Sequence, residues 1–246
     1  MEHRMNIEDI ISKLKSLANP ESVKGMARYG INPENTLGIS IPQLRSMAKS
    51  IGKSHSLADE LWRSGEHEAQ ILAAMIDEPG KVTDEQLERW VKDIDSWDVC
   101  DMCCSNLFDR TKYARKKAVE WSGRKEEYVK RAGFSLMAAL AVHDKGSPDD
   151  LFIGFLPVIE RESTDERNYV KKAVNWALRQ IGKRTPALNR AAIKSAKRIQ
   201  GIDSKSARWI ASDALRELTG EAVQERLKAG QDLKSGGERK RRVSSR

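Results

Sequence analysis

Apolar residues recur with the period of an α-helix along nearly the whole chain, and this pattern constrains the fold more than any other feature. Near the start, one helical face carries Ile7, Ile10, Ile11, Leu14 and Leu17. Residues 44–51 repeat the pattern, after a proline, Pro42, that suits the first turn of a helix. No segment alternates apolar and polar residues as a half-buried strand does. The sequence therefore predicts an all-α protein.

Helix start signals divide the chain into about a dozen short helices. Thr83 can cap one helix, and Gln86, three residues later, can complete a capping box with it. Ser147-Pro148 and Thr185-Pro186 mark two further starts, because proline is favoured in the first helical turn.

Weak internal repetition accompanies the helices. The segment YVKRA at Tyr128 returns as YVKKA at Tyr169, 41 residues later, and Ala177-Leu178-Arg179 returns at Ala214, 37 residues later. A period near 40 residues is typical of HEAT or armadillo-like repeats. Because such repeats stack into a curved array with a concave binding surface, the sequence predicts an α-solenoid of HEAT-like repeats with a concave basic groove.

Charge is unevenly distributed over the 246 residues, whose net charge is +8. Segment 57–101 carries −9, whereas segment 167–210 carries +11 with Asp203 as its one acidic residue. The last thirteen residues, 234–246, carry +5 and one apolar residue, so we expect a disordered basic tail after a folded domain at 1–233. The asymmetry favours a surface made for an anion; a set of solvated helix faces is the alternative.

The three cysteines, Cys100, Cys103 and Cys104, have no second pair to complete a structural zinc site. We therefore expect no metal and no cofactor, and interpret the cysteines as small buried thiols. The chain begins without an apolar signal segment, and its longest apolar stretch, 136–142, is too short to span a bilayer. These features predict a cytoplasmic protein with no membrane partner.

Trp97 and Asp101 can lie one turn apart on a helix that Asp95 or Ser96 would cap. An aromatic plane beside a carboxylate suits a cationic ligand. Arg131 begins an otherwise apolar helix and can form a bidentate pair with a phosphate or a carboxylate. The alternatives are a core tryptophan, a solvated aspartate and a surface arginine.

A second cluster interleaves basic side chains with tryptophan, as nucleic-acid-binding surfaces do. Its aromatic residue is Trp176, for which a place in the core is the alternative. The basic residues that we expect to bind DNA are Lys171, Lys172, Arg179, Lys183, Arg184 and Arg208.

Six segments together resemble the bacterial DNA alkylation repair proteins of the AlkD type. They are MARYGI (26–31), LGISIPQLRSMAK (37–49), HEAQILAAMI (67–76), SWDVCD (96–101), KRAGFSLMA (130–138) and VKKAVNWALRQIGKR (170–184). The resemblance runs from about residue 5 to residue 228. It implies a HEAT-like repeat DNA glycosylase that excises cationic N3- and N7-alkylpurines from duplex DNA.

Carried over residue by residue, the resemblance makes Asp101 the catalytic aspartate. Trp97 and Trp176 match the aromatic residues that flank the sugar and backbone of the lesion, and Arg131 matches the arginine that supports the DNA backbone there. Ser96 stands where the enzymatic type has a first tryptophan. Because MARYGI is shorter than its counterpart, no N-terminal tyrosine is carried over.

We expect a monomer that associates with the nucleoid when bound to DNA. Two other functions stay open at this point. One is a non-catalytic binder of damaged or branched DNA on the same scaffold, and the other is a protein scaffold for an acidic partner. The basic segment 167–210 favours DNA over a protein partner, but does not separate the enzyme from the non-catalytic binder.

Overall fold

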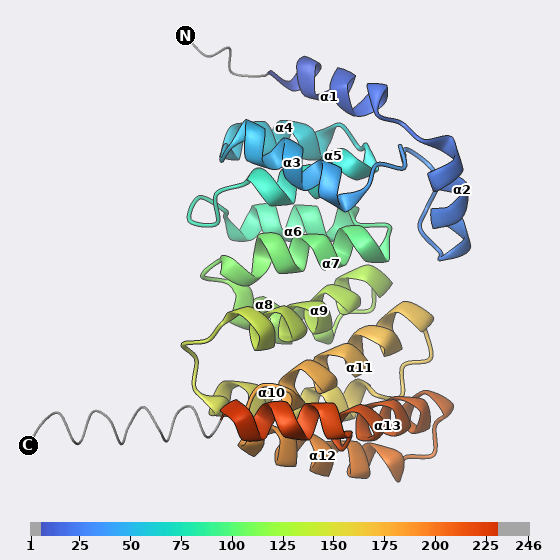
Figure 1. Cartoon of the computed structure of the whole chain (residues 1–246), viewed down its shortest axis with the longest axis vertical. Coiled ribbons are helices and arrows are strands. Elements are labelled where there is room, and N and C mark those ends of the chain that lie inside the picture. Colours follow the sequence, from blue (N-terminus) through green and yellow to red (C-terminus); the bar gives the residue numbers. More distant parts are fainter. Residues whose placement is uncertain (1–5, 231–246) are drawn as a thin grey trace, which may run out of the picture. The chain divides into compact units, whose positions relative to one another are not determined.

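The computed structural model describes residues 6–230, which form thirteen α-helices, α1–α13, one 3-10 helix and a helical segment at 221–230 (Figure 1). This described part contains no strand, so the all-α prediction is confirmed. Between residues 6 and 230, every helix is too short or too polar to span a bilayer. The basic tail expected at 234–246 lies outside the described residues.

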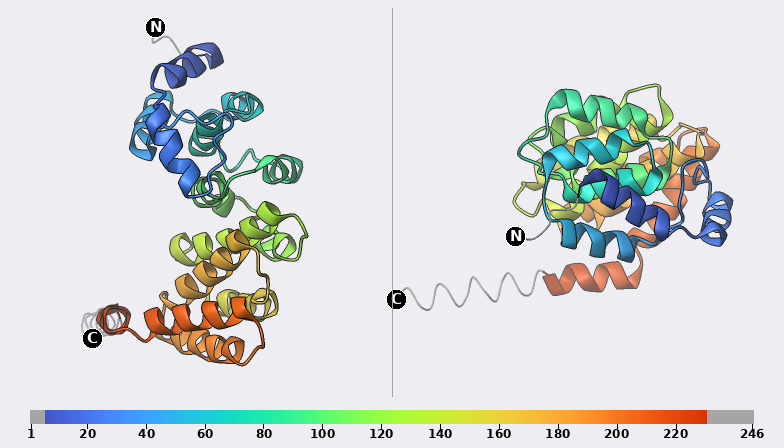
Figure 2. Two further views of the ribbon diagram at one scale, coloured as in Figure 1. Left: turned by 90° about the vertical axis from the view of Figure 1, so that its right-hand side faces the viewer. Right: turned by 90° about the horizontal axis from the view of Figure 1, so that it is seen from above.

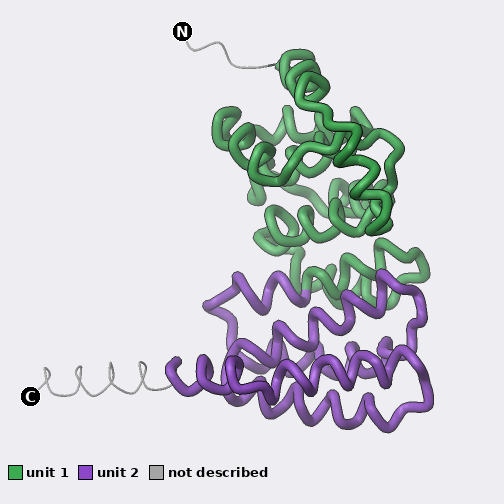
Figure 3. Tube along the Cα trace, turned by 45° about the vertical axis from the view of Figure 1, so that its right-hand side comes forward, with its two compact units in different colours: residues 1–136 green, residues 137–246 purple. Residues whose placement is uncertain are grey.

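The chain divides into two compact units, 1–136 and 137–246, coloured separately in Figure 3. The boundary falls inside helix α9 (Glu127–His143). A boundary within a helix carries no linker signal of proline, glycine or polar residues. For that reason the sequence, which suggests one domain over 1–233, does not reveal it.

Unit 1 contains eight complete α-helices, the 3-10 helix and the start of α9. They are α1 (Ile7–Ser16), α2 (Pro20–Arg28), α3 (Ile41–Ile51), α4 (His55–Arg63), α5 (His67–Ile76), α6 (Asp84–Asp93), α7 (Trp97–Asn106), the 3-10 helix η1 (Phe108–Arg110) and α8 (Ala114–Ser122). Helix α5 contacts α3, α4 and α7, and nearly all of its residues are buried. Trp62 and Trp90 stack with ring centroids 4.1 Å apart and join α4 to α6. Helix α5 is therefore the centre of the unit.

Unit 2 contains the end of α9 and four further labelled helices. They are α10 (Asp149–Glu162), α11 (Asn168–Gly182), α12 (Pro186–Gln200) and α13 (Lys205–Leu218). Helix α12 contacts α10, α11 and α13, and α11 also contacts α13 (Figure 2). A Cβ atom on Gly182 would lie 2.7 Å from both methyl carbons of Leu218. Glycine at this position therefore permits the close approach of α11 and α13.

The predicted helix starts hold, with two differences at the helix ends. Helix α10 begins at Asp149, so Pro148 is the N-cap residue and not part of the first turn. Thr83 caps α6 and accepts a hydrogen bond from the backbone N–H of Gln86, as expected. The expected capping box does not form, because the Gln86 side chain donates instead to the buried Asp77 carboxylate, at 2.7 Å. Thr185 caps α12 ahead of Pro186, also as expected.

The repeat spacing differs between the units. Helices α5, α7 and α9 begin 30 residues apart, at His67, Trp97 and Glu127, whereas α11 and α13 begin 37 residues apart, at Asn168 and Lys205. The predicted period near 40 therefore fits α11 to α13 and is wrong for α5 to α9. Helix length gives the reason: the interval from α5 to α7 contains two helices of 10 residues, α5 and α6, whereas the interval from α11 to α13 contains two of 15 residues, α11 and α12.

Candidate active site

Helix α7 positions Trp97 and Asp101 one turn apart, as the sequence predicts. Ser96 is the N-cap residue, but its hydroxyl donates to the side chain of Asp98, at 2.6 Å, rather than accepting from the helix backbone. The Trp97 indole N–H donates to the backbone carbonyl of Tyr29, at 3.1 Å. A segment far earlier in the chain therefore orients the Trp97 ring.

The Asp101 carboxylate binds Arg131 and Ser135, both on α9. The Arg131 Nη2 and Nε atoms lie 2.7 and 3.1 Å from the two carboxylate oxygens, which is a bidentate pair. The Ser135 hydroxyl donates to Asp101 Oδ1 at 2.8 Å. Three donors thus fix this carboxylate in one orientation, while its side chain keeps 22% exposure to solvent.

Arg131 is 5% exposed, so the alternative of a surface arginine is wrong. Burial alone lowers the pKa of its guanidinium, but the negative charge of Asp101 offsets that effect and raises the pKa above its ordinary value. Arg131 therefore keeps its positive charge. Support of a DNA backbone by Arg131 stays a prediction, because at least two of its donor atoms already bind Asp101.

Asp101 and Trp97 border a cavity of about 380 Å³ in unit 1. Most of the other lining side chains are apolar and come from α2, α3, α5, α7 and the residues before α3. They are Met26, Ile31, Ile39, Ile41, Ile71 and Met102. Space for a flat or apolar group therefore adjoins the carboxylate and the indole ring.

Two buried polar groups at the cavity were missed by sequence reasoning. His67 Nε2 lies 2.9 Å from Asp98 Oδ2, and the charge and hydrogen bonding of Asp98 raise the pKa of His67 although burial lowers it. The Glu68 carboxylate accepts hydrogen bonds from the backbone N–H groups of residues 37–39, at 2.8, 2.6 and 3.1 Å. Glu68 thereby anchors the chain that forms one wall of the cavity.

Tyr29 is a further residue that the sequence analysis left out. Its ring is 76% exposed, and its carbonyl is the acceptor for Trp97. Helix α2, which ends just before it, has no buried residue. Tyr29 stands within MARYGI, one of the segments that carry the resemblance, and its backbone carbonyl is the atom that contacts the predicted site.

The structure brings together three of the four predicted catalytic residues, Asp101, Trp97 and Arg131, all in unit 1. Trp176 lies half-buried on α11 in unit 2. Its action together with Asp101 stays a prediction. The neighbouring Asn175 is buried and donates to Asp213, at 2.7 Å, so one side of this helix turn is already held by α13.

The predicted DNA-binding cations do not form one unpaired face. Glu217 on α13 binds both Arg179 and Lys183, at 2.5 and 2.6 Å, and Arg208 pairs with Asp203, at 2.9 Å. Lys172 is exposed, and Lys171 lies with its Nζ atom 5.5 Å from the Trp209 ring centroid. The acid that neutralises Arg179 and Lys183 stands just beyond segment 167–210, so the charge of that segment overstates the free positive charge.

Arg184 is held by neutral groups. Its guanidinium donates to the carbonyls of Ala141 and Ser147, both at 3.1 Å, and lies 4.3 Å from the Phe152 ring centroid. A carbonyl does not cancel a positive charge, so Arg184 contributes to the potential of unit 2 although its donors are engaged.

The three cysteines are buried, as interpreted from the sequence. Burial raises the pKa of the Cys103 and Cys104 thiols, which disfavours the reactive thiolate. Cys104 donates to the Ala132 carbonyl across the α7–α9 contact, at 3.6 Å. Within residues 6–230, no group of three or more His, Cys, Asp or Glu side chains could hold a metal ion.

Comparison with solved structures supports the fold. A protein described as belonging to "a new family of proteins related to the HEAT-like repeat DNA glycosylases with affinity for branched DNA structures" superimposes with a TM-score of 0.73 at 19% identity, covering 86% of this chain and 95% of that chain. A designed armadillo repeat protein in complex with a (KR)4 peptide reaches a TM-score of 0.35 at 13% identity, over 77% of this chain and 90% of that chain, too low to indicate a shared fold. The HEAT-like fold expected from the sequence is thus confirmed, and its concave basic groove stays a prediction.

Among curated proteins, the uncharacterized protein Lin0241 of Listeria innocua serovar 6a is 24% identical over 136 residues. That match covers 54% of this chain and 61% of the relative, so the chain spans less than two thirds of the relative's length. The model of a family described as "DNA alkylation repair enzyme" matches residues 10–218. Because the match runs through both units and covers most of the chain, this protein belongs to the DNA alkylation repair enzyme family.

Proposed function

We propose that this protein is a DNA-repair glycosylase that hydrolyses the N-glycosidic bond of cationic N3- or N7-alkylated purines in duplex DNA. One observation carries the proposal. A carboxylate, Asp101, is fixed by two partners, remains partly exposed and borders a cavity beside the indole ring of Trp97. The membership of the family supports DNA as the substrate.

The chemistry of the lesion fits this arrangement. An alkylated purine already carries positive charge, so the base leaves without a proton from the enzyme. The sugar becomes oxocarbenium-like as the bond breaks, and a fixed negative charge nearby stabilises it. Asp101 would supply that charge and could accept a proton from the attacking water. The face of Trp97 adds cation–π attraction toward the same centre.

Arg131 and Ser135 act as positioning residues in this scheme. A carboxylate held in place before the reaction has no reorganisation to undergo as charge develops. The same contacts also occupy both carboxylate oxygens with hydrogen bonds, which leaves fewer lone pairs to accept a proton from water. This balance favours electrostatic stabilisation over proton abstraction as the main role of Asp101.

A second candidate is a non-catalytic binder of branched DNA. The solved structure with the same fold is described by its affinity for such DNA, and Ser96 replaces a tryptophan of the enzymatic type. The pairing of Asp101 with Arg131 also suits this candidate, because such an ion pair can be purely structural.

The test is release of free 7-methylguanine from a defined duplex, measured over time by liquid chromatography. We expect release above the spontaneous rate of the same duplex without protein, and no release of guanine from an unmodified duplex. Binding to a four-way junction and to the linear duplex is measured in parallel. Junction binding without base release would replace the enzyme with the non-catalytic binder. Failure to bind either DNA would favour a protein scaffold.

A further inference from the structure

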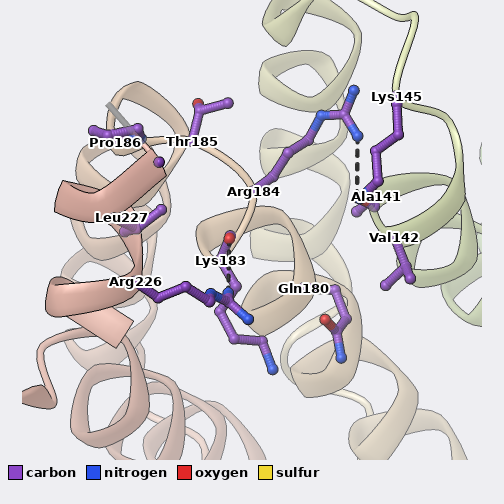
Figure 4. Close-up of a pocket in the computed structure, with 11 residues that line it drawn as sticks. Ala141, Val142, Lys145, Gln180, Lys183, Arg184, Thr185, Pro186, Arg226 and Leu227 are labelled. Atoms are coloured by element: carbon purple, nitrogen blue, oxygen red, sulfur yellow. Dashed lines mark hydrogen bonds between the residues drawn. The ribbon is translucent and has the colours of Figure 1, made fainter. Parts of the chain in front are cut away.

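Unit 2 contains a cavity of about 440 Å³ whose lining includes none of the residues assigned to the proposed reaction. It lies among the end of α9, the turn between α11 and α12, and the helical segment 221–230 (Figure 4). Four cations contribute to its lining: Lys183 is paired with Glu217, and the other three are Lys145, Arg184 and Arg226. The apolar part of the lining includes Val142, Pro186 and Leu227.

The positive charges of these three cations are not cancelled by carboxylates. Within residues 6–230, Lys145, Arg184 and Arg226 form no ion pair with an acidic side chain. Arg184 binds the Ala141 and Ser147 carbonyls, and Arg226 donates to the Lys183 carbonyl at 2.8 Å, as Figure 4 shows in part. Lys145 is exposed at the rim. Neutral acceptors fix the two arginines in place and leave their charge available.

The acidic residues nearest in the hydrogen-bond network already have partners. Glu217 binds Lys183 and Arg179, and Asp149 accepts a hydrogen bond from Thr185, at 2.6 Å. Asp144, next to Lys145, accepts a hydrogen bond from the Ser147 hydroxyl, also at 2.6 Å. The Thr185 and Pro186 residues in the lining begin α12, whose N-terminal end adds positive partial charge. The cavity is therefore a concave site with a surplus of positive charge.

We propose that this cavity binds a phosphate group of a nucleic-acid strand, with the adjoining sugar or base against the apolar wall. Guanidinium groups in fixed positions suit phosphate oxygens, and a lysine at the rim adds a point charge. The apolar residues Val142, Pro186 and Leu227 would exclude water from the nucleoside part. The proposal rests on the proposed function for its ligand and extends it with a second DNA contact, in unit 2.

The test compares two double variants that remove the same charge. Lys145→Gln with Arg226→Gln alters the cavity and spares Arg184, which contacts Phe152 and two carbonyls and could be needed for folding. Arg190→Gln with Lys194→Gln is the matched control, because both residues are exposed on α12 and outside the cavity lining. Affinity for a fluorescein-labelled duplex and a labelled single strand is measured by anisotropy over a salt series, after thermal melting confirms folding.

We expect the cavity variant to bind duplex DNA more weakly than the wild type. Its slope of log K against log salt should flatten by roughly 0.9 for each lost phosphate contact. The affinity and the slope of the control variant should change less. Pyrophosphate, titrated calorimetrically at constant ionic strength, distinguishes the source. Binding of pyrophosphate to the wild type that the cavity variant loses would support a site for free phosphate groups.

Equal effects of the two double variants on DNA binding, without pyrophosphate binding, would overturn the cavity proposal and leave the proposed function intact. If the wild type binds no DNA, the proposed function fails instead. The pyrophosphate titration still decides the cavity in that case, because loss of pyrophosphate binding in the cavity variant alone would uphold an anion site there.

Discussion

The two units use ion pairs in opposite ways. In unit 1, an almost fully buried cation, Arg131, fixes a partly exposed carboxylate, Asp101, at the edge of a cavity. In unit 2, a carboxylate, Glu217, binds Arg179 and Lys183, two of the cations that the sequence assigns to DNA. One pair therefore holds a carboxylate at the edge of a cavity, whereas the other removes positive charge from the surface.

The contrast teaches that the charge of a sequence segment does not measure the charge of a surface. The partners in each pair stand one repeat apart along the chain. Asp101 and Arg131 are 30 residues apart, and Arg179 and Glu217 are 38 residues apart. A segment count of charge stops at the ends of the segment, so it misses a partner on the next repeat.

The largest expected effect comes from removing the charge of Asp101. Asp101→Asn should lower 7-methylguanine release by about 10²-fold or more, the scale seen when one preorganised electrostatic group is lost. DNA affinity should not weaken, because the substitution removes a negative charge that would repel the DNA phosphates. The measurements are single-turnover release and anisotropy binding.

Asp98→Asn is the matched control for that variant. Asp98 lies on the same helix, also borders the cavity and pairs with His67, so its loss costs stability while the Asp101 carboxylate and its pair with Arg131 stay in place. Should a folded Asp101→Asn protein release base at the wild-type rate, Asp101 has no part in the chemistry and the contrast between the units disappears.

Removing Arg131 sharpens the comparison in terms of stability. Arg131→Met should lower the free energy of unfolding by about 2–3 kcal/mol. This loss is at or below that for breaking a fully buried ion pair, because solvent reaches part of the Asp101 carboxylate. Arg179→Met, in unit 2, should cost about 1 kcal/mol or less, since Arg179 is 29% exposed and Lys183 remains on Glu217. Urea unfolding measures both values, and equal losses would show that burial does not distinguish the pairs.

A smaller effect is expected from single lysines of unit 2. Lys172→Gln should weaken duplex binding severalfold and reduce the salt slope by roughly 0.9 if its ammonium contacts one phosphate. Lys183→Gln should change the slope less, because the Lys183 ammonium already binds Glu217 at 2.6 Å. A larger change for Lys183 than for Lys172 would mean that DNA displaces Glu217 on binding.

The smallest expected effect is a pH dependence of stability from unit 1. Burial lowers the pKa of His67, but Asp98, with Glu68 and Asp95, raises it above its ordinary value of 6.5. The stabilisation is therefore fully present below pH 6.5 and is lost as pH rises through the raised pKa. The melting temperature should fall between about pH 6 and about pH 8, and His67→Gln should remove that part of the fall. An unchanged pH profile in this variant would exclude the His67–Asp98 pair as its source.

Much of the candidate site could be predicted from the sequence because it depends on residues that are close together along one helix. A helix places residues four apart on one face, so the spacing of Trp97 and Asp101 is enough to assign them to one site. The resemblance assigns Arg131 and Trp176 to this site; Arg131 contacts Asp101, and the place of Trp176 stays a prediction. Tyr29 was missed, since its place beside Trp97 depends on a hydrogen bond between residues 68 positions apart.

By itself, the sequence determined that the chain is helical and where several helices begin, because helical period and capping act within a few residues. The tertiary structure alone decided which charges are paired, that Gln86 binds Asp77 instead of closing its capping box, and that unit 1 repeats every 30 residues. Those outcomes depend on how neighbouring helices align, and side-chain packing between repeats sets that alignment. One example is Gly182, whose missing side chain leaves room for Leu218.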